Sequence, residues 1–251
     1  MKVASITWQD KIDRAEHLSS QQDATGDVLR FYAKILRFQE NLQGRLTETS
    51  SDIHQLVPFV PQFLELLAHS GTPKMKELAE SSTSLDWGAE LNTHWNDRAA
   101  REYTPLAFIA LTLLQPFAHH LAAHAQIHDQ QIAPHCPFCL STPQLGILRP
   151  EGEGGKRYLL CSLCGTEWEY RRVICPNCEE GDKEKLPVFK SEQVRHVKLA
   201  ACDSCKTYLK CIDVGIDGHA IPEIDDVASL PMSLWMTENG FRPMKLNLFG
   251  F

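Results

Sequence analysis

The sequence predicts an α+β protein of two domains, an all-α domain over residues 1–130 and a cysteine-rich domain over residues 131–251. Two observations predict this division. In the first part, apolar residues recur at helical spacing and no strand alternation competes with them. The second part holds short strand candidates between turn residues and cysteine pairs, and all nine cysteines lie after residue 135. A chain of 251 residues is long enough for two ordinary domains.

The first part contains four candidate helices. They are expected over residues 27–38, over residues 54–69, from Pro73 onward and over residues 103–128. Asp27 is expected to cap the first helix, because an aspartate carboxylate can accept a free amide of the first turn. The last helix is expected to be mostly buried and kinked at Pro116. Residues 82–99 show no clear period.

The second part contains short strands and one helix. Strands are expected over residues 157–160, 167–173, 194–199 and 207–214. A final helix is expected over residues 226–237, because Asn239 and Gly240 form a stop signal after it. Glu223, Asp225 and Asp226 are interpreted as residues that favour the start of this helix through capping, rather than as a catalytic acid pair.

Eight of the nine cysteines form four C-x2-C pairs, which are separated by 21, 10 and 23 residues. One pair can place two sulfurs on one ion, and a second pair about 15 to 20 residues later completes a tetrahedral site. The spacing favours two metal sites made from neighbouring pairs. The first would use Cys136, Cys139, Cys161 and Cys164, and the second Cys175, Cys178, Cys202 and Cys205. A crossed arrangement, in which the second pair joins the third, stays open.

The chemistry of four thiolates limits what these sites can do. Such a set suits zinc and also a single iron of the rubredoxin type, and the sequence does not separate the two metals. It leaves no open coordination position, so the sites are not expected to be catalytic. The sequence also lacks a nucleophile elbow, an HExxH motif and a Walker motif. We therefore predict a protein that is not an enzyme.

Other titratable residues give weaker signals. Cys211 has no partner pair and is interpreted as a buried strand thiol rather than a reactive one. His120, His124 and His128 recur four residues apart, which could form a metal-binding face. Because no acidic residue or cysteine follows the same period, they are interpreted as a solvated or interdomain helix face. The sequence does not assign a role to these four residues.

Composition excludes several classes of protein. The formal net charge is −7 and neither part has a basic excess, which argues against binding to nucleic-acid phosphates. The N-terminus lacks the pattern of a secretory signal, and the longest apolar stretch, residues 105–118, is too short to cross a membrane. The sequence thus predicts a cytoplasmic protein without stable membrane insertion. It leaves the oligomeric state open, with a homodimer as one alternative.

Several segments around the cysteine pairs carry a family likeness. These are YLLCSLCGTEW at residues 158–168, RVICPNC at residues 172–178, CDSCKTYLK at residues 202–210 and the tail over residues 226–241. They resemble the formate dehydrogenase accessory protein family, FdhE. The likeness is specific over residues 134–245 and only general over the helical part.

The resemblance implies a cytoplasmic protein that is needed to form active formate dehydrogenase. Such a protein acts on the catalytic subunit before its export, rather than on formate. The resemblance also implies a rubredoxin-like or zinc-ribbon-like domain that holds two metal ions, with iron favoured and zinc the alternative. The eight paired cysteines correspond one by one to the family's ligands. Leu140 departs from the family pattern, in which a glycine commonly follows the first pair.

Two functions compete on these grounds. The first is a non-enzymatic maturation factor, a kind of chaperone, that binds the catalytic subunit of formate dehydrogenase. The second is a rubredoxin-like electron-transfer protein that acts in metalloenzyme maturation. The additional helical domain favours binding. A zinc-ribbon protein that binds nucleic acid is a third class, and the acidic composition argues against it.

Overall fold

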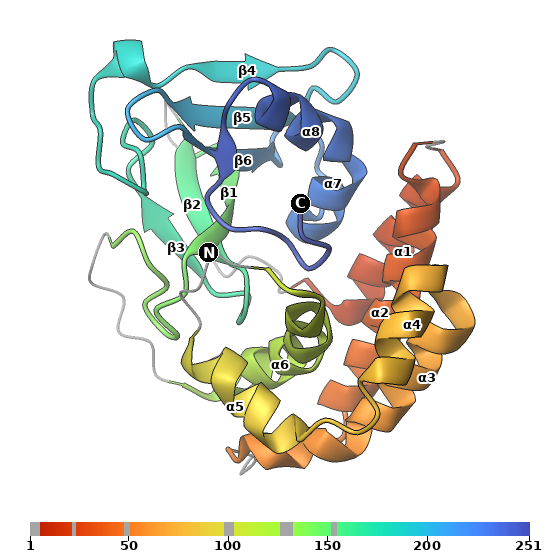
Figure 1. Ribbon diagram of the computed structural model, residues 1–251. Coiled ribbons are helices and arrows are strands. Elements are labelled where there is room, and N and C mark those ends of the chain that lie inside the picture. The colour runs from red at the N-terminus through yellow and green to blue at the C-terminus, as the bar shows by residue number, and fades with distance from the viewer. Residues whose placement is uncertain (1–5, 22–23, 48–50, 98–102, 126–132, 152–154) are drawn as a thin grey trace.

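The computed structural model describes residues 6–21, 24–47, 51–97, 103–125, 133–151 and 155–251 (Figure 1). The first region is helical, as predicted. Its elements are α1 (Trp8–Ser19), α2 (Gly26–Gln43), η1 (Ile53–Phe59), α3 (Val60–Ser70), α4 (Pro73–Ser81), α5 (Trp87–Asn96) and α6 (Pro105–His124). His128 and the predicted domain boundary near residue 130 lie outside the described residues.

Two details of the predicted helices need correction. Asp27 does not cap α2, because the helix begins one residue earlier; its carboxylate pairs instead with Arg30 in the next turn. The single helix expected over residues 54–69 is a 3-10 helix followed by α3. Pro58 lies inside the 3-10 segment, and Pro61 is the second residue of α3, where a missing amide breaks no intrahelical hydrogen bond.

Helix α6 is the long buried helix that the sequence predicted. Its first turn is capped by the Thr104 hydroxyl, which accepts a hydrogen bond from the amide of Ala107. Among the helices that the structure describes, only α6 has the length and apolar composition of a membrane span. However, 61% of its most apolar 18-residue window is buried inside the protein, as in a core helix. Pro116 lies inside α6, and the kink expected there stays a prediction.

The second region forms a seven-stranded sheet in the order β3-β2-β1-β6-β5-β4, with β7 beside β6. The strands are β1 (Pro143–Arg149), β2 (Lys156–Cys161), β3 (Glu167–Tyr170), β4 (Val188–Lys190), β5 (Val197–Cys202), β6 (Thr207–Asp213) and β7 (Arg242–Pro243), and a short 3-10 turn η2 (Lys183–Lys185) precedes β4. Pairing is antiparallel except between β1 and β6 and between β6 and β7. The four predicted strands are confirmed as β2, β3, β5 and β6, with shifted ends.

The sheet consists of two units that follow the same path. Each contains a cysteine pair, two antiparallel strands, a second cysteine pair and a third strand. We call residues 136–170 unit one and residues 175–213 unit two. The parallel pairing of β1 with β6 joins the two units into one sheet. The repeat of cysteine pairs in the sequence is therefore a repeat of structure.

Strand β1 was not predicted, because a proline and a glycine interrupt its alternation. Gly146 of β1 lies opposite Cys211 of β6. A Cβ atom added at Gly146 would lie 2.6 Å from the Cys211 sulfur, closer than such atoms can approach. Glycine is therefore required for the close approach of these two strands.

The predicted final helix is longer than expected and is divided into two helices. It consists of α7 (Pro222–Ala228) and α8 (Leu230–Glu238), with a break at Ser229. The predicted start at residue 226 is therefore four residues late. Pro231 cannot donate the hydrogen bond that would continue α7 into α8.

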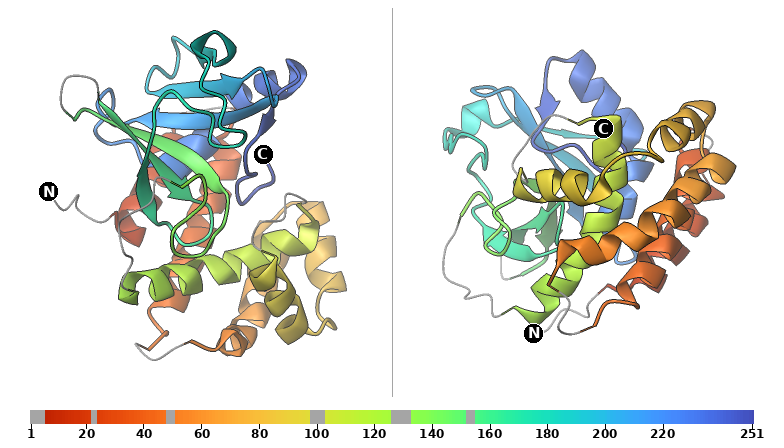
Figure 2. Two further views of the ribbon diagram at one scale, coloured as in Figure 1. Left: turned by 90° about the vertical axis from the view of Figure 1, so that its left-hand side faces the viewer. Right: turned by 60° about the horizontal axis from the view of Figure 1, so that its bottom comes forward.

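One hydrophobic core runs through both regions of the molecule. The same cluster of buried side chains contains Leu29 and Phe117 from the helices and Leu159 and Leu209 from the sheet. Helix α7 lies between the sheet and the pair α1 and α2 (Figure 1), and α6 runs beside unit one (Figure 2). The division into domains at residue 130 stays a prediction, and the two regions are held together by shared apolar contacts.

The acidic residues of α7 pair with cations from both regions. Lys11 contacts Glu223 at 2.7 Å, Arg14 contacts Asp225 at 2.6 Å and Lys210 contacts Asp226 at 2.7 Å. The capping interpretation needs correction, because these residues lie inside α7 and not before it, and its N-cap, Ile221, makes no side-chain cap; the Asp225 carboxylate instead accepts the Ile221 amide at 2.7 Å from within the helix. Their larger role is to hold α7 between the helices and the sheet. A sequence pattern could not predict this role, because all three cations are distant along the chain.

Candidate metal centres

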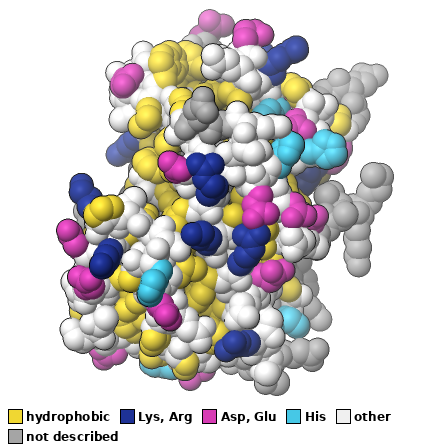
Figure 3. Space-filling model, turned by 90° about the vertical axis from the view of Figure 1, so that its right-hand side faces the viewer, with side chains coloured by type: hydrophobic (Ala, Val, Ile, Leu, Met, Phe, Trp, Pro, Cys, Tyr) yellow, Lys and Arg dark blue, Asp and Glu magenta, His cyan; other side chains and the backbone are white. Residues whose placement is uncertain are grey.

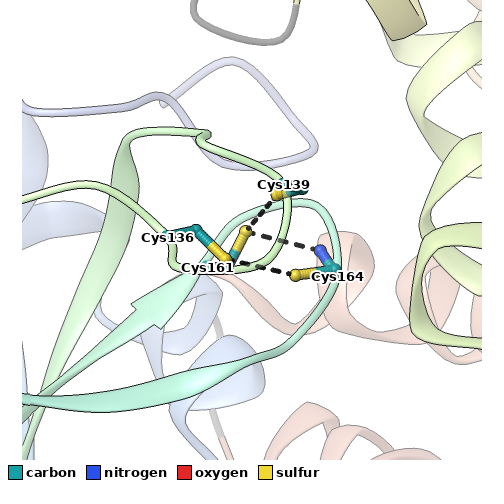
Figure 4. Close-up of side chains that lie close together, drawn as sticks. All are labelled: Cys136, Cys139, Cys161 and Cys164. Atoms are coloured by element: carbon teal, nitrogen blue, oxygen red, sulfur yellow. Dashed lines mark hydrogen bonds between the residues drawn. The ribbon is translucent and has the colours of Figure 1, made fainter. Parts of the chain in front are cut away.

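The eight paired cysteines gather into two clusters. Cluster one contains Cys136, Cys139, Cys161 and Cys164, and cluster two contains Cys175, Cys178, Cys202 and Cys205. The sulfur atoms of each cluster all lie within 4.8 Å of one another. In cluster one, the sulfur atoms of Cys136 and Cys164 are 3.5 Å apart and those of Cys139 and Cys161 3.3 Å apart (Figure 4). The corresponding distances in cluster two are 3.7 and 3.6 Å. Neighbouring pairs are thus brought together, and the crossed arrangement is not formed.

The residue after each cysteine pair has a left-handed backbone. These residues are Leu140 (φ 62°), Gly165 (φ 67°), Glu179 (φ 58°) and Lys206 (φ 53°). In three of the turns, the amide of this residue donates to the carbonyl of the first cysteine at 2.9–3.0 Å. Leu140 therefore makes the same turn as glycine would, although the left-handed conformation costs a side chain about 1–2 kcal/mol.

Backbone amides and hydroxyl groups surround the sulfur atoms. The amides of Leu163 and Cys164 donate to the Cys161 sulfur at 3.4 and 3.5 Å. The Thr166 hydroxyl lies 3.1 Å from the Cys164 sulfur, and the Thr207 hydroxyl lies 2.9 Å from the Cys205 sulfur. Each threonine is the second residue after its cysteine pair. Hydrogen bonds of this kind stabilise thiolates, which are the form that binds a metal.

The thiols of a cluster influence each other's ionisation. In cluster one, hydrogen bonds with the other three thiols, Cys136 first, lower the pKa of Cys139. Burial raises the pKa of Cys161. In cluster two, burial raises the pKa of Cys205, but hydrogen bonds from Thr207 and Asn177 outweigh this effect and lower the pKa to about 6. Four sulfurs this close cannot all be charged without a cation among them.

The two clusters differ in their exposure to solvent. All four cysteines of cluster one are buried, and Cys136 is 0% exposed. In cluster two, Cys178 is exposed and Cys205 is half-buried, while the other two cysteines are buried. Cluster two is therefore open to solvent on one side, and cluster one is enclosed.

Helix α6 packs directly against cluster one. A Cβ atom added at Gly165 would lie 2.5 Å from His119 Cε1, so the turn fits against the imidazole only as glycine. His119 also packs on Trp8 of α1, with ring centroids 5.6 Å apart, and burial lowers its pKa to about 3. Gln115 donates to the Ser162 carbonyl at 3.0 Å. The second cysteine turn of unit one is thus part of the contact between the sheet and the helices.

The weaker candidates from the sequence lie elsewhere. Cys211 is buried in β6, as predicted, and burial raises its pKa. His120 is buried in α6, and its carbonyl accepts a hydrogen bond from His124 Nδ1 at 2.8 Å. Within the described residues, neither histidine belongs to a group of metal-ligating side chains. The histidine that contacts a cluster is instead His119, which the periodic pattern did not single out.

A third group of candidate ligands contains His196, Asp217 and Asp225. The guanidinium of Arg14 already contacts both carboxylates, at 2.7 Å for Asp217 and 2.6 Å for Asp225. His196 Nε2 lies 2.8 Å from the Asp225 carboxylate. Because a cation from the protein neutralises these acids, we interpret the group as a structural contact and not as a metal site.

Comparison with known proteins agrees with this architecture. The family model described as FdhE, central domain matches residues 135–172, which hold unit one, and FdhE, C-terminal domain matches residues 173–249, which hold unit two. An FdhE homolog of Aquifex aeolicus is 27% identical over 96% of this chain and 94% of its own length. An FdhE homolog of Haemophilus influenzae is 30% identical over 85% of this chain and 67% of its own length.

A solved structure has the same fold. The crystal structure of the FdhE protein from Pseudomonas aeruginosa matches with a TM-score of 0.76 at 24% identity, over 99% of this chain and 97% of that one. Fold and sites together define a class of proteins in which a helical region joins a sheet with two four-cysteine clusters. The chain belongs to the FdhE family of formate dehydrogenase accessory proteins, which are in general not catalytic.

Proposed function

We propose that this protein binds the catalytic subunit of formate dehydrogenase in the cytoplasm, before its export, and supports its maturation without acting on formate. Family membership is the observation that carries the proposal. The shared core supports it, because the helices add a large surface to the cysteine-bearing sheet. A protein that only carried electrons would not need this surface.

The eight cysteines would hold two metal ions, one in each cluster. Metal–sulfur bonds of about 2.3 Å at tetrahedral angles separate the sulfurs by about 3.8 Å. In each cluster two sulfur pairs, at 3.3–3.7 Å, come close to this value, and all pairs lie within 4.8 Å. The amides and threonine hydroxyls would stabilise the thiolates. The family resemblance favours iron, and zinc is the alternative; either metal would stabilise the folded sheet.

A second function is favoured by one specific observation. Cys178 is exposed and Cys205 is half-buried, so a redox-active iron in cluster two would lie close to a partner's surface. This favours a rubredoxin-like electron carrier in metalloenzyme maturation. Reversible reduction at a defined potential would support this alternative. Colourless zinc at both clusters would exclude it.

Two measurements test the proposal. Metal analysis and a visible spectrum of anaerobically purified protein should give about two metal ions per chain. Size-exclusion chromatography of the purified protein with the precursor of the formate dehydrogenase catalytic subunit should give a stable complex. A complex that forms with an unrelated exported enzyme equally well, or no complex at all, would contradict the binding function. The same chromatography of the protein alone determines whether it is a homodimer.

A further inference from the structure

An apolar groove lies between the edge of the sheet and α8. Its volume is about 830 Å³. The residues that line it include Val188, Phe189 and Val194 from β4 and the following loop, and Pro231, Met232 and Trp235 from α8, with the polar residues Lys190, Ser191, Gln193 and Ser229 at its rim. Figure 3 shows hydrophobic side chains over the upper end of the molecule, with charged side chains of both signs among and below them. Neither the proposed metal sites nor the charged contacts of α7 use this groove.

Two large apolar residues at the groove are exposed, Trp235 inside it and Val188 at its edge, where strand alternation turns the Val188 side chain to the face opposite Phe189. Val188 is 53% exposed and Trp235 is 41% exposed. The Trp235 ring packs edge-on against Phe189, with centroids 5.2 Å apart, so it is already held in place. A fixed, exposed tryptophan beside a hollow is typical of the side chains that dominate protein binding.

The backbone of β4 forms a free edge beside this groove. β4 is the last strand in the sheet order. The Ala201 amide donates to the Pro187 carbonyl at 2.9 Å, which makes this a hydrogen-bonded pair. Because such pairs alternate in antiparallel strands, the backbone groups of Val188 and Lys190 face away from β5. In the described part of the chain, no strand pairs with them.

We propose that the groove and this edge bind one extended apolar segment of the formate dehydrogenase catalytic subunit. The segment would add a strand to β4 through main-chain hydrogen bonds, as other peptides do at free sheet edges. Because side chains alternate along a strand, every second side chain would enter the groove beside Trp235. The inference rests on the proposed function and names the feature of the partner that this surface recognises.

The shape of the surface favours such a segment over a second copy of this chain. Pairing of β4 with the β4 of another copy would satisfy the same backbone groups. It would bring only the three residues Val188–Lys190, and the Phe189 ring among them is already packed on Trp235 of its own chain, so neither hollow would be filled. An extended segment with apolar side chains satisfies the edge and fills the groove at the same time.

Two groove variants and one matched control test the proposal on the full chain. Val188→Pro removes the outward amide of β4 and leaves the hydrogen bonds to β5 intact. Trp235→Ser removes the exposed aromatic ring without changing the strand. Ile216→Ser is the control, because Ile216 is a 54% exposed apolar residue outside the groove. Unchanged metal content and thermal midpoint show that a variant is folded, and either groove variant suffices for the test.

The probes are overlapping 15-residue peptides of the catalytic subunit, measured by fluorescence anisotropy, and the intact subunit. We expect a peptide with alternating apolar residues to bind, and each groove variant to weaken this peptide and the intact subunit at least tenfold. Ile216→Ser should bind like the wild type. Equal binding of the intact subunit by all variants would contradict the groove as the binding site and would still support the proposed function. No binding by the wild type would overturn both. A dimer in sedimentation that Val188→Pro abolishes would assign the edge to a second copy.

Discussion

Units one and two have the same order of cysteine pairs and strands, yet they are placed differently in the molecule. Cluster one is enclosed, and its second turn contacts His119 of α6. Cluster two lies at the periphery and keeps Cys178 exposed. A shared local motif therefore fixes the sulfur positions in both units. The surroundings determine whether a cluster holds the fold together or remains accessible to a partner.

The two units are also attached to the helices by different forces. Unit one is held by close packing, with Gly165 against the His119 ring. Unit two adds buried charges to its apolar contacts with the shared core, because Asp225 of α7 contacts both Arg14 of α1 and His196 before β5. The stabilisation from close packing is lost when the shape of either surface changes. The stabilisation from a buried ion pair is lost when either charge is removed. These contacts can be broken one at a time.

The largest expected effect comes from removing the cysteines of one cluster. In Cys161→Ser/Cys164→Ser, we expect loss of the cooperative unfolding transition of the whole chain. A thiolate site contributes about 10 kcal/mol of apparent folding free energy, which is comparable to the whole stability of a domain. Because the helices share one hydrophobic core with the sheet, we expect this loss of stability to extend to the helices. Circular dichroism during thermal unfolding and metal analysis measure the effect.

The matched variant is Cys202→Ser/Cys205→Ser in unit two. It should lose one metal ion per chain and retain a cooperative helical transition, because cluster two lies at the edge of the fold. If the two double variants unfold alike, the difference in burial does not determine the structural role of the clusters.

The next largest effect is expected from Asp225→Asn. This carboxylate is 2% exposed, and its neutralisation would leave the Arg14 guanidinium with one of its two carboxylate partners. Breaking a buried ion pair typically costs about 3–5 kcal/mol. Urea unfolding measures the change in the free energy of unfolding. The control is Glu16→Gln, which breaks a half-exposed pair with Arg37 and should cost less than about 1 kcal/mol. Equal costs would contradict the proposed role of buried charge.

The features that could be predicted from the sequence are those that depend on residues close together along the chain. The cysteine clusters follow from spacing along the chain, and Pro73 indicates a helix start because its fixed backbone angle suits that position. The partners of Asp225 could not be predicted, because Arg14 is more than 200 residues away. β1 was missed because Gly146 is there for its contact with Cys211, not for strand propensity. The same holds for His119, whose role depends on where α6 meets unit one.

A smaller effect is expected from Gly165→Ala, which tests the packing of unit one. The backbone there has φ 67°, and the new Cβ atom would lie 2.5 Å from the His119 ring. Backbone strain and overpacking together should cost about 2–4 kcal/mol. Gly181→Ala is the control in unit two, because a Cβ atom there meets nothing within 4 Å. Thermal unfolding of both variants measures the difference, and a neutral Gly165→Ala would contradict both the backbone strain and the close packing on His119.

The smallest expected effect has the opposite sign and concerns the first turn of unit one. Leu140 adopts φ 62° and is 68% exposed, so its side chain contributes little packing while its backbone is strained. Leu140→Gly should relieve about 1–2 kcal/mol of strain. The greater freedom of glycine in the unfolded chain offsets about 0.5–1 kcal/mol of this gain. We therefore expect a net stabilisation of about 0.5–1 kcal/mol and a rise in Tm of about 2 °C.

Glu179→Gly makes the same change in unit two, where φ is 58°. If cluster one holds the whole fold and cluster two does not, Leu140→Gly should raise the global Tm and Glu179→Gly should leave it unchanged, whereas equal shifts would mean that both units unfold together.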